Sequence, residues 1–197
     1  MTDLNHHPSS EGSRGIERLA LLNVTLLHQG RKLIEAMSDE AFTVAIPPLS
    51  NHGVGCHFRH CLDYYQCFLD GVEAGRINYD HRRREPRLET ERGYALGVID
   101  HTVERLEAAT ATGDRPLAVS GDSAGAPPLA EEGSAGDGLI WSRSTLLREL
   151  QGLVSHTVHH YALISMLLRT LHIDPGPEFG VAPSTLEHWK EQTACAG

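Results

Sequence analysis

The segment LVSHTVHHYALI, residues 153–164, places His156 and His160 one helical turn apart. Because an α-helix has about 3.6 residues per turn, side chains at positions i and i+4 lie on the same face. That face is otherwise mostly apolar. The residues within about 60° of His160 on the predicted helix are Leu146, Glu149, Leu153, His156, Leu163, Ile164, Leu167 and Leu171. Two imidazoles therefore interrupt a stripe that faces the core, where helical bundles build metal sites.

The spacing of this pair is compatible with a metal site and also with two ordinary core histidines. The chain has 13 histidines among 197 residues, so about one i, i+4 pair is expected by chance. Buried imidazoles need partners for their nitrogens in either case. Both interpretations stay open for the pair alone, because a metal site needs at least a third ligand.

Length and charge limit the classes of protein to which the chain can belong. A chain of 197 residues is long enough for one buried core. Its formal charge of −9, with both signs interspersed, offers no basic surface for nucleic acid or an anionic membrane. No apolar run approaches the roughly 20 residues of a membrane span, and the first residues lack a signal-peptide pattern. We expect one cytoplasmic domain without a nucleic-acid or membrane partner.

The four cysteines, at positions 56, 61, 67 and 195, include no Cys-x-x-Cys pair. Three of them fall within one predicted helix, so a disulfide framework is not expected. We interpret Cys56 and Cys67 as small core residues, with a redox or ligand role as the alternative.

Helical periodicity predicts four long amphipathic helices. The segments in which apolar residues recur every three or four positions are 16–37, 51–72, 88–109 and 145–171. Ser50 or Asn51 can cap the second helix, and Ser144 or Thr145 can cap the fourth. Residues 1–14 are polar and are predicted to form a flexible tail.

Between residues 113 and 141 the helical periodicity ends and the composition of the sequence changes. Two strand-like pieces, 116–120 and 138–142, flank a segment rich in Gly, Ala and Pro and predict a β-hairpin with a mobile tip. After residues 174–177, which read DPGP, the C-terminal segment is predicted to be irregular. The expected fold is all-α. It is an up-down-type four-helix bundle with a small hairpin between the third and fourth helices, in one domain over residues 15–197.

The second predicted helix offers a third imidazole. Antiparallel neighbours in a bundle can present side chains to one another across the core. His60 shares a polar-tolerant face of its helix with Cys56, Asp63 and Tyr64. His57 lies about 60° away from that face and is the second choice as a ligand. His159 is interpreted as a flanking or surface residue.

These segments resemble a known family. The segment GVGCHFRHCLDY, residues 53–64, followed by SHTVHH, residues 155–160, looks like the DinB/YfiT-like superfamily of metal-binding four-helix bundles. The segments YDHRRREP, residues 79–86, and FGVAPSTL, residues 179–186, are similar to parts of a bacterial branch of the DinB family. The resemblance covers residues 15–189 and rests on several ordered motifs.

The resemblance implies a divalent metal ion held by His60, His156 and His160, with Asp63 completing an H-x-x-D motif. It also implies relatives that transfer or isomerise small molecules with bacillithiol, mycothiol or glutathione, and relatives regarded as metal-dependent hydrolases. Related iron-dependent sulfoxide synthases carry H-x-x-x-H-x-E. Here Ala162 stands at the position of that glutamate, which argues against the same iron chemistry.

Three neutral nitrogens leave the ion its full charge and an open coordination position, which favours a deprotonated water or thiol. Glu149, two turns before His156 on the same face, is the first candidate for a base or proton shuttle, and a helix N-terminal carboxylate is the alternative. Asp63 is a candidate for orienting a ligand imidazole through its second nitrogen. A surface or helix-pairing carboxylate is the alternative for Asp63.

Two classes of function remain. The first is a metal-dependent enzyme that activates a thiol or water for transfer, isomerisation or hydrolysis of a small electrophile. The second is a non-catalytic metal-binding or stress-response protein with a structural site. A fourth protein ligand from Glu149, Cys56 or His57 would favour the second class, whereas a bound water beside an accessible pocket would favour the first. Imidazole ligands accept Zn, Ni, Fe or Cu, a low-molecular-weight thiol is a candidate cofactor, and an exposed helix face can pair two copies into a homodimer.

Residues 82–84 form a run of three arginines. A solvated charge run, compensated by Glu85, Glu89 and Glu91, is the usual interpretation of such a run. An inward-facing arginine would instead bind the carboxylate of a thiol cofactor or substrate. The sequence leaves these two interpretations open.

Overall fold

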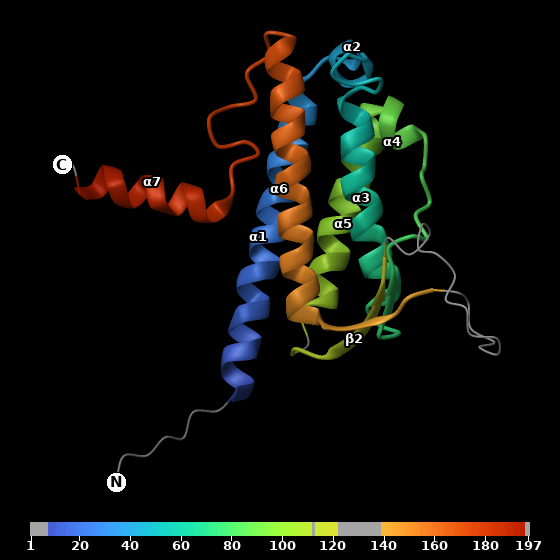
Figure 1. Cartoon of the computed structure of the whole chain (residues 1–197), viewed down its shortest axis with the longest axis vertical. Coiled ribbons are helices and arrows are strands. Elements are labelled where there is room, and N and C mark those ends of the chain that lie inside the picture. The colour runs from blue at the N-terminus through green and yellow to red at the C-terminus, as the bar shows by residue number, and fades with distance from the viewer. Residues whose placement is uncertain (1–7, 112, 122–138, 196–197) are drawn as a thin grey trace.

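The computed structural model describes residues 8–111, 113–121 and 139–195. This part of the protein is mostly helical, with seven helices and a three-stranded sheet. Four long helices run side by side (Figure 1). They are α1 (Pro8–Ala36), α3 (Val54–Gly71), α5 (Arg92–Ala109) and α6 (Leu146–Thr170). The shorter helices are α2 (Asp39–Thr43), α4 (Arg87–Thr90) and α7 (Pro183–Cys195).

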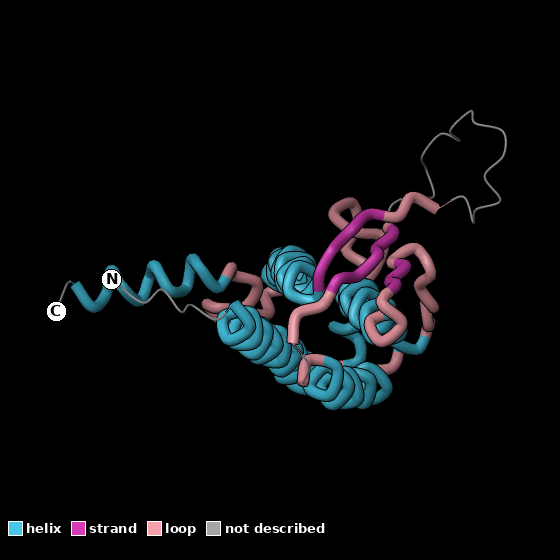
Figure 2. Tube along the Cα trace, turned by 90° about the horizontal axis from the view of Figure 1, so that it is seen from below, coloured by secondary structure: helices cyan, strands magenta, loops and turns pink. Residues whose placement is uncertain are grey.

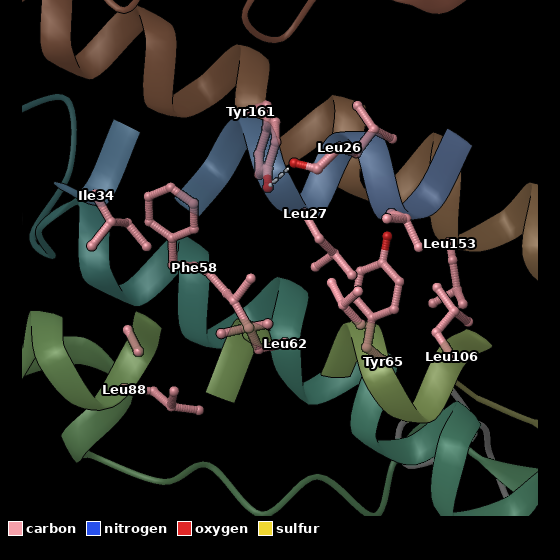
Figure 3. Packing of buried hydrophobic residues seen from close by; sticks show 14 of the residues in the cluster. Leu26, Leu27, Ile34, Phe58, Leu62, Tyr65, Leu88, Leu106, Leu153 and Tyr161 are labelled. Carbon is pink, nitrogen blue, oxygen red and sulfur yellow. Dashed lines mark hydrogen bonds between the residues drawn. The ribbon is translucent and has the colours of Figure 1, made fainter. Parts of the chain in front are cut away.

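The long helices contact one another in a closed ring. Helix α1 packs against α5 and α6, and α3 packs against the same two helices. Their apolar faces meet in one core, whose largest side chains include Phe58, Tyr65 and Tyr161 (Figure 3). The Tyr161 hydroxyl donates to the carbonyl of Leu26 at 2.9 Å. Gly30 permits this close approach, because a Cβ there would collide with the Tyr161 hydroxyl.

A buried polar network ties α1, α3 and α6 together. Thr157 donates to the Tyr65 hydroxyl at 3.1 Å, and Tyr65 donates to Asn23 Oδ1 at 2.8 Å. Asn23 in turn donates to the carbonyl of Leu150 at 3.1 Å. Asn23, Tyr65 and Thr157 are fully buried. Because buried polar groups are costly when unpaired, this network favours one relative placement of the three helices.

The sheet contains β1 (Arg76–Asn78), β2 (Pro116–Ser120) and β3 (Ser142–Thr145). It lies beside the helices in the end-on view of Figure 2. Strands β2 and β3 pair antiparallel as predicted, but β3 begins at residue 142 rather than 138. Strand β1 pairs parallel with β2 and was not predicted, because a strand of three residues has no readable periodicity. The predicted hairpin tip falls within residues 122–138, outside the described residues.

Several helix boundaries differ from the predictions. Residues 8–14, assigned to the tail, form the first turns of α1, and residues 1–7 lie outside the described part. Helix α3 starts after Gly53, because Ser50 instead accepts from the backbone N–H of His52 and closes a turn. The predicted helix 88–109 is interrupted at Glu91, whose backbone is extended.

The prediction of an irregular C-terminal segment was wrong, because Pro183 opens the helix α7. Proline suits the first position of a helix, where its missing N–H has no intrahelical partner to lose. Within the described ranges, no helix combines the length and apolarity that crossing a lipid bilayer would need.

Replacing Tyr65 with phenylalanine should lower the free energy of unfolding by about 1–2 kcal/mol, because it leaves Asn23 and Thr157 with unpaired buried atoms. Chemical denaturation of the metal-free protein measures this effect. Tyr94→Phe, at a half-buried tyrosine of α5, is the control and should cost less than about 0.5 kcal/mol. Equal losses for the two variants would contradict a stabilising role of the network.

Candidate metal centre

His60 of α3 meets His156 and His160 of α6 where the two helices pack together. One nitrogen of each imidazole lies within 4.8 Å of one nitrogen of each of the others. The Nε2 atoms of His60 and His156 are 3.2 Å apart. Two nitrogens bound to one tetrahedral ion at about 2.05 Å would lie about 3.3 Å apart. The predicted convergence of the three histidines is confirmed, and their geometry fits one shared ion.

The triad lies at the edge of the core rather than in its centre. On α6, Thr157 and Tyr161 are buried, whereas the neighbouring His156 and His160 are half-buried. The same pattern occurs on α3, where His60 is half-buried beside the buried Cys61. The imidazoles therefore line the margin of the interface between α3 and α6.

The surroundings keep His156 and His160 neutral. Burial, together with the smaller effects of the neighbouring His60, His159 and Arg82, lowers the pKa of His156 to about 4. Burial also lowers the pKa of His160 to about 3, with the surrounding imidazoles acting in the same direction. Neutral imidazole is the form that binds metal ions. Both side chains are therefore ready to act as ligands at neutral pH.

His57, the second choice as a ligand, contacts one member of the triad. Its Nδ1 lies 3.2 Å from Nδ1 of His160. If His160 donates its Nδ1–H to His57, the Nε2 lone pair of His160 is free for an ion. His57 is thus placed to orient His160, and it is not part of the group of mutually close ligand atoms.

His156 is held mainly by stacking. Its ring lies on Tyr64, with centroids 3.8 Å apart and an interplanar angle of 21°. Its Nδ1 is buried without a hydrogen-bond partner among the described residues. Metal-bound imidazoles usually donate this second N–H to an acceptor. In this site, ring packing takes over the orienting role for His156.

Asp63 has partners other than the imidazole expected for it. It is buried and accepts from Arg59 Nη1 at 3.1 Å and from the backbone N–H of Arg84. Burial raises the pKa of Asp63, although the positive charge of Arg59 opposes the shift. Asp63 therefore anchors the segment after β1 to α3, and it is not a surface carboxylate.

Arg82 is the member of the arginine run that reaches the site. Its Nη1 lies 3.4 Å from Nδ1 of His60, and its guanidinium lies 5.6 Å from the centre of the Tyr64 ring. Arg82 is half-buried, whereas Arg83 and Arg84 are exposed. Arg83 pairs with Asp70 at 2.8 Å. One arginine of the run therefore places a positive charge beside the triad.

Glu149 reaches the triad only indirectly. It accepts from the Tyr79 hydroxyl at 2.8 Å and from the hydroxyl of Ser144. Tyr79 stacks on Tyr64, with centroids 5.0 Å apart, and Tyr64 stacks on His156. Burial and the adjacent Glu149 raise the pKa of Tyr79 strongly, so its hydroxyl stays protonated and donates. Two aromatic rings thus separate the carboxylate from the imidazoles.

The site residues that sequence reasoning missed or undervalued are Tyr64, Tyr79 and Arg82. Tyr64 follows His60 by one helical turn, which is a usable signal, although most tyrosines of helical proteins only pack. Tyr79 and Arg82 lie in the segment after β1. Their approach to the site depends on tertiary structure, and the sequence carries no local signal for it.

A second cluster of ligand-type side chains consists of His52, Cys56 and Glu89. Arg59 already pairs with the Glu89 carboxylate, and its Nη2 lies 3.5 Å from the sulfur of Cys56. The Arg59 guanidinium therefore already balances the negative charge of Glu89, so this cluster does not need a metal ion to do so. Within the described residues, the histidine triad is the better candidate for a metal ion.

Comparison with known proteins identifies no family. No family model matches the chain, and no solved structure matches it. A curated protein with partial similarity is FK506-binding protein 5 of Rhizopus delemar, 32% identical over 120 residues. The match covers 59% of this chain but 28% of that protein. The chain thus spans little more than a quarter of the length of this relative. The candidate metal centre is therefore inferred from the positions of the three histidines alone.

The metal-free protein should lose stability as the pH falls from about 6.5 towards 4. The pKa values of His156 and His160 are lower in the folded state than the ordinary value of about 6.5, so the unfolded chain takes up protons first. Their contribution is fully present above about pH 6.5 and is lost as the pH falls towards the folded pKa values. Urea denaturation in the presence of a chelator measures this profile.

The variant His156→Leu should flatten the profile between pH 6.5 and 4, because it removes one of the two histidines whose pKa is lowered in the folded state. His159→Leu is the matched control, since His159 is an exposed neighbour on the same helix. An unchanged pH profile in His156→Leu would contradict the lowered pKa of this half-buried imidazole.

Proposed function

We propose that the protein binds one divalent metal ion through His60, His156 and His160 and uses it to activate a thiol or water against a small electrophile. The observation that carries the proposal is the convergence of three imidazoles, from two helices, to within 4.8 Å of one another. The ligand set contains nitrogen only, which suits Zn, Ni or Fe.

We also propose that α1, α3, α5 and α6 form a four-helix bundle of the DinB/YfiT-like kind. The ring of contacts among these helices supports the proposal, as does the placement of the triad between two of them. Metal sites of bundle proteins are built from inward-facing side chains on neighbouring helices.

Three protein ligands are typical of catalytic sites, whereas structural zinc sites are usually closed by four. Here the neighbouring His57 contacts His160 instead of joining the cluster of ligand atoms. An ion held by three neutral imidazoles would supply Lewis acidity, which favours the deprotonated form of a water or thiol. The half-buried position of the triad gives a small molecule access. These features favour an enzyme over the alternative, a non-catalytic metal-binding or stress-response protein.

Residues of the chain itself would position the substrate and handle protons. Arg82 offers a fixed positive charge beside His60, which suits the carboxylate of a low-molecular-weight thiol. Tyr64 covers one face of His156. A role for Glu149 as a base would require proton transfer through Tyr79, because the Tyr79 hydroxyl occupies one of its oxygens.

The proposed partner is a small-molecule substrate, and the proposed location is the cytoplasm of a bacterium. The formal charge of −9 supports the absence of a nucleic-acid or anionic-membrane partner. The resemblance of the segments around the triad to the DinB family supports the bacterial and cytoplasmic assignments.

Purified protein should bind about one divalent ion per chain, and His156→Ala should weaken binding by at least about 10-fold because it removes a ligand. Mass spectrometry of the metal content and calorimetric titration with Zn²⁺ or Ni²⁺ measure the two quantities. The control is His159→Ala, which removes an exposed imidazole from the same helix. Full occupancy in His156→Ala would exclude the proposed site.

Arg82→Gln should weaken the binding of a carboxylate-bearing thiol such as glutathione by about 10-fold or more, because it removes a charge-assisted hydrogen bond. Cysteamine, a thiol without a carboxylate, should bind both forms equally. Calorimetry on metal-loaded protein measures these affinities. Arg83→Gln is the matched control, since Arg83 is exposed and pairs with Asp70.

Metal binding by the wild-type protein without affinity for any small thiol and without turnover of electrophiles would favour the non-catalytic alternative. Equal loss of glutathione affinity in Arg82→Gln and Arg83→Gln would contradict the positioning role of Arg82.

A further inference from the structure

The segment between β1 and α4, residues 79–86, holds Arg82 in a position that is unfavourable for an arginine. We call this segment the strap. The Nη1 atom of Arg82 lies 3.4 Å from Nδ1 of His60, and its Nε atom is buried without a hydrogen-bond partner among the described residues. The ion pairs of those residues include Arg59 and Arg83 but not Arg82. A guanidinium taken out of water without a paired carboxylate is unfavourable, so other contacts of the strap must hold it there.

On the β1 side of Arg82, the strap is fixed by its backbone. The backbone N–H of Tyr79 donates to the carbonyl of Ser120 in β2 at 2.8 Å. The thiol of Cys67, on α3, donates to the carbonyl of His81 at 3.6 Å. The residues that precede the arginine are therefore held by β2 and by α3.

On the α4 side, one buried carboxylate of α3 holds the strap. Asp63 is 2% exposed and accepts from the backbone N–H of Arg84. Asp63 also accepts from Arg59 Nη1 at 3.1 Å, so its carboxylate is fixed in turn. Arg83 pairs with Asp70, but both side chains are exposed, and exposed ion pairs contribute little. Asp63 is therefore the main anchor on this side of the strap.

Arg84 adopts a backbone conformation that residues with a Cβ rarely take. Its φ is 51°, in the left-handed region. The Arg84 side chain is exposed, so burial of that side chain does not explain the conformation. The hydrogen bond from its N–H to Asp63 is the contact that holds the turn. Backbone strain of this kind persists where the surroundings enforce it, and it is concentrated at ligand-binding sites.

We propose that Asp63 and the left-handed turn at Arg84 are positioning elements, which hold Arg82 beside His60 so that its guanidinium selects ligands with an anionic group. The inference rests on the proposed function for the site itself and adds the residues that set its selectivity. A guanidinium that is already in place loses little side-chain freedom when an anion binds. The anion also supplies the negative charge that Arg82 lacks. Asp63 acts through the backbone of the strap and does not touch the ligand.

Two substitutions of Arg84 form a matched pair, because both remove the same charge. Modification by phenylglyoxal, followed by mass spectrometry, measures the exposure of each arginine in the metal-free protein. In the wild type, Arg82 should react about 10-fold more slowly than the exposed Arg83. Arg84→Val should bring the two rates to within about 3-fold, because a β-branched residue disfavours a positive φ. Arg84→Gly accepts this φ and should keep Arg82 protected.

The same pair tests the selectivity of the site. On zinc-loaded protein, Arg84→Val should weaken glutathione binding by about 10-fold and change cysteamine binding by less than about 2-fold. Arg84→Gly should keep both affinities within about 3-fold of the wild type, because glycine preserves the turn. Calorimetry measures these affinities, and circular dichroism and Zn²⁺ binding monitor folding in each variant.

A double-mutant cycle tests the role of Asp63. Asp63→Ala should weaken glutathione binding by about 10-fold in the wild type but by less than about 2-fold in the Arg82→Gln variant, where the positioned group is already absent. If Asp63→Ala does not fold, the two Arg84 variants decide the question, because Arg84 is exposed.

Equal reactivity of Arg82 and Arg83 in the wild type would overturn the inference, and so would equal protection of Arg82 in the two Arg84 variants. Equal losses of glutathione and cysteamine affinity would overturn it as well, since they would indicate a general disturbance of the site. A protein that binds neither metal nor thiol, but in which Arg84→Val exposes a protected Arg82, would overturn the proposed function and uphold the positioning of Arg82.

Discussion

The packing of α3 against α6 is the contact on which the candidate site depends. Two buried pairs set the register of these helices: Phe58 meets the edge of Tyr161, and Tyr65 accepts from Thr157. His60 lies between the two α3 members of these pairs in sequence, and His156 and His160 each precede an α6 member by one residue. The apolar and hydroxyl side chains of this interface are therefore buried, whereas its imidazoles lie at the margin. A slip of one helix against the other would separate the ligands.

The charges around the triad influence the kind of ion that it can hold. Among the residues that the structure describes, no carboxylate belongs to the group of mutually close ligand atoms, and Asp63 and Glu149 are engaged by Arg59 and by Tyr79. Ca²⁺ and Mg²⁺ require oxygen ligands, whereas borderline transition metals accept imidazole. Arg82, beside His60, adds positive charge that opposes any bound cation and favours an anionic ligand. With imidazole ligands and Arg82 nearby, the site is suited to a metal ion of moderate affinity and to an anionic group beside it.

The sequence predicted the parts of the structure that repeat at helical spacing. The long helices and the pairing of His156 with His160 follow from the 3.6-residue period, and His60 followed from the face that it shares with Asp63 and Tyr64. The contacts of Asp63 with Arg84 and of Glu149 with Tyr79 could not be predicted, because Arg84 and Tyr79 lie in the segment after the three-residue strand β1. Helix α7 was missed because Leu186 and Trp189 are too few apolar positions to form a readable stripe.

Helix α6 carries different features on its two sides. Val158 lines a hollow between α1 and α6 and lies about 160° around the helix from both His156 and His160, so the hollow and the triad lie on opposite sides of α6. Between these sides, Thr157 and Tyr161 hold α6 to α3 and α1 through buried hydrogen bonds. Because buried polar groups are costly when unpaired, these bonds favour the helix rotation that keeps both imidazoles facing His60.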